Sequence, residues 1–66
     1  MKVYEALEKA KNNDIVWVHD WDTCELVAVF DNSEIALDCL GNFILNKDVF
    51  KSDSIRKNEL GIYIRF

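Results

Sequence analysis

The segment IVWVHDWDTCELVAVFD, residues 15–31, decides the fold of this 66-residue chain. It contains two runs rich in β-branched and aromatic residues, 15–19 and 25–30, separated by a polar stretch. This pattern predicts a β-hairpin whose turn lies within residues 20–24. Both strands are apolar on both faces, although a chain of this size has little material with which to cover two faces of a sheet. One face is therefore expected to meet the protein's own helices, and the other face something else.

The length of the loop decides which side chains of the hairpin share a face. A loop with an odd number of residues, such as 21–23, gives one face of compact aliphatic side chains plus one phenylalanine, which suits packing under helices. A loop with an even number mixes the two sets, so we prefer the odd loop. The inward set is then Val16, Val18, Leu26, Ala28 and Phe30. The outward set is Ile15, Trp17, His19, Val27 and Val29.

An amphipathic helix is predicted on each side of the hairpin. The first spans residues 2–12, where apolar side chains recur at helical spacing, and it ends at an Asn-Asn-Asp run. The second begins at residues 31–33, where Asn32 or Ser33 can cap it. It is expected to stop at a C-terminal glycine cap formed by Gly41.

The last third of the chain is less regular. Residues 49–54 are a candidate strand, residues 58–61 are expected to form a turn, and residues 62–66 alternate as a strand that joins the hairpin. The sequence thus predicts a single domain, residues 1–66, of the α+β class. Its sheet is expected to be antiparallel, with three or four strands and two helices in the order α-β-β-α-(β)-β.

Composition and charge limit the classes of function. The apolar content of 50% argues against disorder. The chain begins MKVYEALEKAK and has no long apolar run, so we expect no signal peptide, no membrane span and a cytoplasmic location. In that compartment Cys24 and Cys39 are expected to be thiols, although the sequence leaves a bridge between them open.

The net charge of −4 is unevenly distributed. Residues 1–42 carry nine acids and three bases, whereas residues 43–66 carry three acids and five bases. An acidic front half disfavours direct binding of nucleic acid, because neutralised phosphates supply most of that affinity. It suits a protein partner with a basic surface.

No catalytic arrangement is convincing in the sequence. His19 and Cys24 could act as base and nucleophile across the hairpin, but a half-buried strand histidine near a buried thiol is the preferred interpretation. Asp20, Asp22 and Glu25 could bind a divalent cation, but their spacing does not match a calcium loop, and a solvated acidic turn is preferred. We therefore expect no enzyme activity, no metal and no cofactor.

The outward face of the hairpin is the first candidate contact site. It joins Trp17 and His19 to Val27 and Val29, and Tyr63 is expected beside them if the last strand pairs with the hairpin. Trp and Tyr are enriched at the energetic centres of protein interfaces. The alternative is that the first helix covers this face in a three-layer sandwich.

The tip of the hairpin and the spread of acids are two further candidates. An exposed Trp21 among Asp20, Asp22 and Glu25 suits a partner pocket lined by Arg or Lys; the alternative is that Trp21 folds back on the sheet. Aligned carboxylates could also imitate spaced phosphates, although most acidic faces are only solvated. That third set is Glu5, Glu8, Asp14, Asp31, Glu34 and Asp38.

The overall character of the chain adds a resemblance. Lys, Asn and Ile occur six times each, glycine occurs twice and proline is absent, which favours an AT-rich genome. In size, acidity, amino-acid usage and lack of catalytic residues, the chain resembles small early proteins of phages and prophages of low-GC Gram-positive bacteria. Anti-CRISPR proteins are one such group of anti-defence inhibitors.

The resemblance implies a stoichiometric, non-enzymatic inhibitor of a host defence or nucleic-acid-processing protein. The alternatives are an acidic nucleic-acid mimic and a homodimeric structural or regulatory protein. In each case the contacts are expected to be with protein, and not with nucleic acid or membrane. The residues expected to contact the partner are Trp17, His19, Asp20, Trp21, Asp22, Glu25 and Tyr63.

Overall fold

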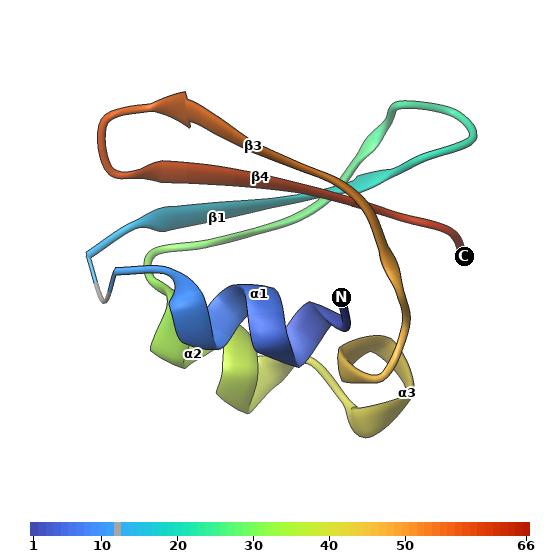
Figure 1. Cartoon of the computed structure of the whole chain (residues 1–66), viewed down its shortest axis with the longest axis horizontal. Helices are drawn as coiled ribbons and strands as arrows, with labels where there is room; N and C mark the ends of the chain where they lie inside the picture. The colour runs from blue at the N-terminus through green and yellow to red at the C-terminus, as the bar shows by residue number, and fades with distance from the viewer. Residues whose placement is uncertain (12) are drawn as a thin grey trace.

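In residues 1–11 and 13–66, which the computed structural model describes, four strands form one sheet and three helices lie on one side of it (Figure 1). Of residues 54–56 only the backbone is described. The predicted α+β class is confirmed. The elements are α1 (Val3–Lys9), β1 (Ile15–Asp20), β2 (Leu26–Phe30), α2 (Ser33–Cys39), α3 (Asn42–Leu45), β3 (Val49–Arg56) and β4 (Glu59–Ile64).

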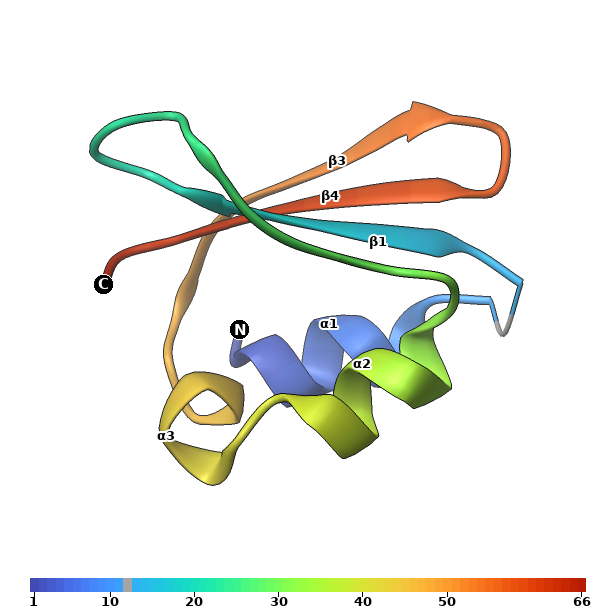
Figure 2. The ribbon, with the colours of Figure 1, turned by 180° about the vertical axis from the view of Figure 1, so that it is seen from behind.

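The sheet is mixed, in the order β2-β1-β4-β3. The two hairpins, β1–β2 and β3–β4, are antiparallel, but the central pair, β1 and β4, is parallel. The sequence predicted an antiparallel sheet and therefore missed this pair. The reason is visible in Figure 2: α2 and α3 carry the chain back beneath the sheet before β3 begins, so that β4 runs in the same direction as β1.

The register of the β1–β2 hairpin confirms the faces that were predicted for four of its inward side chains. Val16 pairs with Phe30 and Val18 with Ala28, so these four side chains share a face. The two valines are fully buried, and Ala28 and Phe30 pack against the core. The segment between the two strands, residues 21–25, is longer than the three residues proposed as an example, and the pair nearest to it, His19 with Leu26, is out of register with the pairs beyond.

Leu26 is the exception, and its predicted inward position is wrong. The register shifts after Val18, so that His19 pairs with Leu26 and β2 holds one residue more than β1 at this point. Such a bulge changes the face of the side chains beyond it. Leu26 accordingly lies on the side of His19, with 49% of its surface exposed.

Both predicted helices are present but their ends differ from the prediction. α1 ends at Lys9, three residues earlier than expected, and the predicted last residue, Asn12, lies outside the described residues. The Asn32 side chain caps α2 by accepting a 2.8 Å hydrogen bond from the Ile35 N–H. Gly41 does not form the predicted glycine cap, because its backbone is extended (φ −73°) and it is the N-cap of α3 instead.

The candidate fourth strand is confirmed as β3, and the last strand lies earlier than predicted. β4 begins at Glu59, so the expected turn over residues 58–61 is reduced to its first part, where Asn58 has a positive φ of 67°. Gly61, which suggested a turn, is buried inside β4, and Phe66 lies beyond the strand.

The core lies between the sheet and the helices (Figure 1). α1 contributes its apolar stripe, α2 contributes one alanine, and the two central strands contribute four aliphatic side chains. No helix in residues 1–11 and 13–66 has both the length and the apolar character needed to cross a membrane. The buried core is Val3, Ala6, Leu7, Val16, Val18, Ala36, Ile62 and Ile64.

Candidate binding surface

The side of the sheet that faces away from the helices is the strongest candidate for a functional site. All three described helices lie on the opposite side (Figure 1, Figure 2), so the alternative in which α1 covers this face is excluded. Its valines and leucine are about half exposed. We call this surface the open face; it consists of Trp17, His19, Leu26, Val27, Val29 and Tyr63.

An aromatic row crosses the open face from β1 to β3. The rings of His19 and Tyr63, neighbours on adjacent strands, stack with centroids 4.5 Å apart and planes 15° from parallel. Trp21 meets the Tyr63 ring edge-on at 6.3 Å and lies 6.0 Å from Phe50 of β3. Trp21 thus folds back toward the sheet, as in one of the two alternatives, yet 41% of its surface remains exposed.

The tip of the hairpin is organised by its own polar groups. Asp20 accepts two hydrogen bonds from residues later in the turn. Its side chain accepts one from the Asp22 N–H at 2.9 Å, and its carbonyl accepts one from the Cys24 N–H at 2.8 Å. Cys24 has a positive φ of 61°, which is costly for a residue with a Cβ. The Trp21 N–H donates to the Ile64 carbonyl at 2.8 Å. The tip is therefore fastened to the end of β4.

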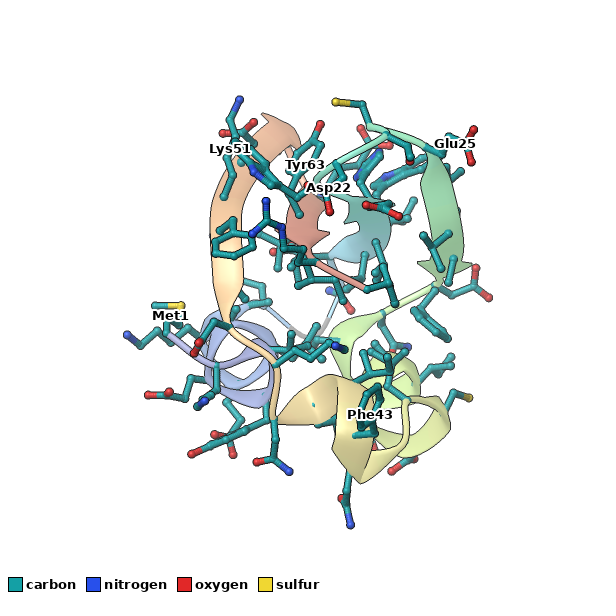
Figure 3. The ribbon with its side chains drawn as sticks, turned by 90° about the vertical axis from the view of Figure 1, so that its right-hand side faces the viewer. Met1, Asp22, Glu25, Phe43, Lys51 and Tyr63 are labelled. Atoms are coloured by element: carbon teal, nitrogen blue, oxygen red, sulfur yellow. The ribbon has the colours of Figure 1, made fainter. Side chains whose placement is uncertain are left out.

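The tip carries fewer free carboxylates than its sequence suggests. The guanidinium of Arg65 pairs with Asp22, with Nη2 3.1 Å from Oδ1 and Nε 3.2 Å from both oxygens. Asp20 is half-buried in its own turn. Glu25 is exposed and lies at the β2 side of the sheet (Figure 3). Of the three acids predicted to meet a basic partner, Glu25 is the one without a described hydrogen bond or ion pair from its side chain.

The β3 side of the open face is polar. The ammonium of Lys51 lies 5.6 Å from the Tyr63 ring centroid and 3.3 Å from the carboxylate of Asp53 (Figure 3). Arg65 extends over the Phe50 ring at 5.4 Å. Sequence reasoning missed Phe50, Lys51 and Asp53, because residues 43–57 show no clean periodicity. The open face thus grades from apolar at β2 to charged at β3.

Two polar atoms beneath this surface have no hydrogen-bond partner among the described residues. They are Nε1 of Trp17 and Nδ1 of His19, and both are shielded from solvent. A buried polar atom without a partner costs roughly 1–3 kcal/mol. Among the described contacts, His19 is therefore held by its stacking on Tyr63, and no hydrogen bond fixes the Trp17 ring.

The rest of the molecule offers little chemistry. Among the described residues, no three His, Cys, Asp or Glu side chains gather as metal ligands. Cys24 is an exposed free thiol, and not the buried one expected. A shallow hollow of about 290 Å³ beside α1 has one carboxylate, Asp14, and two lysines in its wall. Its lining is Met1, Ala6, Lys9, Ala10, Lys11, Asp14, Ser52 and Leu60.

The six carboxylates considered as phosphate mimics are not equally available. Glu5 accepts a 2.9 Å hydrogen bond from the Lys2 N–H at the start of α1, and Asp14 accepts one from the Lys11 N–H at 3.3 Å. Both belong to local chain turns. The remaining four acids are exposed, and three of them follow one another along the end of β2 and α2. These four are Glu8, Asp31, Glu34 and Asp38.

Comparison with protein-family models, with curated proteins and with solved structures found no match. The resemblance to small phage and prophage proteins therefore stays a prediction from size, charge and composition. The residues of the open face and the tip are what remains to indicate a function.

Proposed function

We propose that this chain is a non-enzymatic protein-binding module that acts stoichiometrically on a protein partner through its open face. One observation carries the proposal: the sheet has an apolar side that the helices do not cover. A contiguous exposed apolar surface on so small a protein is typical of a contact site. Trp17 and Tyr63 serve as the aromatic anchors, and Val27 and Val29 extend the contact toward the edge of the sheet.

The chemistry of the partner follows from the charge. A chain of net charge −4 favours encounter with a basic protein surface, and Glu25 is placed to meet a basic group directly. The likeness to phage and prophage proteins supports the biological setting that we propose, which is inhibition of a bacterial defence or nucleic-acid-processing protein. Proteins of that kind carry the basic surfaces that this charge requires.

A comparison of two lysine substitutions tests the proposal. Val29→Lys places a charge in the open face, whereas Ile35→Lys makes the same kind of change on α2 in the helix layer; the two residues are 44% and 39% exposed. Tagged wild type and both variants are used to capture proteins from a lysate of a low-GC Gram-positive bacterium. Native mass spectrometry then measures the stoichiometry of each captured complex.

We expect the wild type and Ile35→Lys to hold the same protein at a fixed ratio, and Val29→Lys to lose it. Equal capture by all three proteins would remove the open face from this account. A wild-type homodimer that Val29→Lys dissociates would show that a second copy, and not another protein, occupies the face.

A further inference from the structure

β2 is an unprotected edge of the sheet. It is the outermost strand on its side, and its five residues, LVAVF, carry no charge and no proline. An edge strand presents unpaired N–H and C=O groups that can pair with another chain, and natural proteins usually block this with charges, prolines or irregular backbone. β2 has only the bulge near Leu26 as such a device.

The opposite edge is protected, which makes the exposure of β2 specific. The first residue of β3, Val49, donates its N–H to the Met1 carbonyl at 2.8 Å, so the start of this edge is already paired. Further along, Lys51 and Asp53 form an ion pair. The pairing of β3 with β4 is also irregular at two points. As far as the described residues show, β2 is thus the edge suited to accept an additional strand.

The two ends of β2 are acidic. Glu25 precedes the strand and Asp31 follows it, and both are exposed. Among the described residues, neither side chain makes a hydrogen bond or an ion pair. Glu25 and Asp31 are six positions apart, which corresponds to about 20 Å of extended chain. Figure 3 shows Glu25 on the β2 side of the molecule, pointing away from the sheet.

This charge pattern distinguishes two possible occupants of the edge, a second copy of this chain and a partner strand with basic ends. In a two-fold antiparallel pair of two copies, centred on Ala28, Glu25 of each copy lies opposite Asp31 of the other. Such a pair places like charges against each other twice, which is destabilising. A strand with a basic residue at each end places opposite charges there instead, in either direction of pairing.

We propose that β2 binds an extended segment of the partner, a short run with apolar side chains at alternate positions and a Lys or Arg at each end, which adds a fifth strand to the sheet. This inference rests on the proposed function and names its mode of binding. Backbone hydrogen bonds along the edge supply affinity, and alternate side chains of the added strand continue the open face beside Val27 and Val29. Glu25 and Asp31 select the basic ends.

Three synthetic peptides with blocked termini test the mode of binding. The first is Lys-Thr-Val-Thr-Val-Thr-Lys, the second has Glu in place of both Lys residues, and the third has Pro in place of the central Thr. Fluorescence anisotropy gives their affinities, and amide hydrogen exchange by NMR locates the contact. We expect the first peptide to bind about tenfold more tightly than the second, the ratio expected when weak surface attractions become repulsions. We expect the third to bind weakly, because proline cannot complete the strand pairing.

Two double variants provide the matched charge control. Glu25→Lys/Asp31→Lys should reverse the preference between the first and second peptides. Glu8→Lys/Asp38→Lys changes the net charge equally, but on the last turns of the helices, and should leave the preference as it is. Circular dichroism of both variants establishes that the fold is retained.

Protection of the β2 amides by the first peptide, together with the reversed preference, supports the inference. Equal affinity for the first two peptides, absence of binding, or protection outside β2 overturns it, and so does a dimer joined through β2. The capture experiment separates this failure from failure of the proposed function. If Glu25→Lys/Asp31→Lys still captures the partner and Val29→Lys does not, the open face is the binding site and the β2 edge is not.

Discussion

Arg65 and Asp22 are 43 residues apart in the chain and form a forked ion pair at the end of the sheet. The pair lies next to Trp21, whose N–H is bound to the Ile64 carbonyl. The tip of the first hairpin is therefore held by the residues at the end of β4 as well as by its own turn. Both charged side chains are more than half exposed, so solvent weakens their attraction.

A double-mutant cycle on this pair should give a small but real coupling. With Asp22→Ala, Arg65→Ala and the double variant, we expect a coupling free energy of about 0.2–1 kcal/mol, since exposed ion pairs contribute this much. The coupling should decrease at high salt, which screens exposed charges. Urea denaturation of the four proteins measures it. The same cycle with Lys9→Ala in place of Arg65→Ala should be additive, because Lys9 lies on α1. Additivity in both cycles would mean that the ion pair does not contribute to stability in solution.

Two leucine substitutions should differ strongly in their cost. Leu7 is 1% exposed in the core, and Leu7→Ala should lower the free energy of unfolding by about 2–5 kcal/mol. Leu26 is 49% exposed, and Leu26→Ala should change it by only about 0.5 kcal/mol or less. Urea denaturation of both variants distinguishes this from the sequence-based prediction, in which Leu26 points into the core. A loss above about 2 kcal/mol for Leu26→Ala would restore that prediction.

Sequence reasoning about the hairpin predicted the wrong face for Leu26. Alternation and loop parity correctly predicted the face of Val16 and Val18 and of their partners, because a period of two holds along a regular strand. A bulge breaks the period, and no residue type in the ELV run marks one. The same reasoning placed Trp17 and His19 outward, and the structure agrees.

The parallel pairing of β1 with β4 could not be derived from local sequence. Each hairpin follows from turn residues and alternation, but the relative direction of two hairpins depends on where the intervening helices bring the chain. α3, only four residues long, shows no period to detect. Gly61 suggested a turn because glycine is rare within strands, whereas it pairs with Trp17 on one side and Asp53 on the other.

Only part of the candidate site was predicted, because some of its contacts depend on the order of the strands. The stacking of His19 on Tyr63 follows once the last strand joins the hairpin, and the sequence predicted that Tyr63 lies beside this face. The pairing of Asp22 with Arg65 joins the first hairpin to the end of the second. Contacts of this kind depend on the order of the strands, so the tip was predicted to be more acidic than it is.

Cys24 is a site where glycine should increase stability. Its φ of 61° lies in the left-handed region, which a residue with a Cβ adopts at a cost of about 1–2 kcal/mol. Cys24→Gly should therefore raise the free energy of unfolding by about 0.5–1 kcal/mol, part of the gain being lost to the greater freedom of glycine in the unfolded chain. Thr23→Gly is the matched control, because Thr23 accepts a 3.2 Å hydrogen bond from the Glu25 N–H and should lose stability. Thermal denaturation of both variants measures the difference, and a loss of stability in Cys24→Gly would contradict the expected strain.

His19→Phe should make the protein more stable without changing the shape of the open face. Phenylalanine can keep the stacking on Tyr63, and it removes the buried Nδ1 that has no hydrogen-bond partner. Since an unpaired buried polar atom costs roughly 1–3 kcal/mol, we expect a gain of about 1 kcal/mol in the free energy of unfolding. His19→Ala removes the ring as well and should cost about 1 kcal/mol, because the stacking and part of the apolar contact are lost. Urea denaturation measures both changes. A His19→Phe variant that is less stable than the wild type would mean that Nδ1 does find a partner in solution, and that His19 contributes a polar group as well as a ring to this surface.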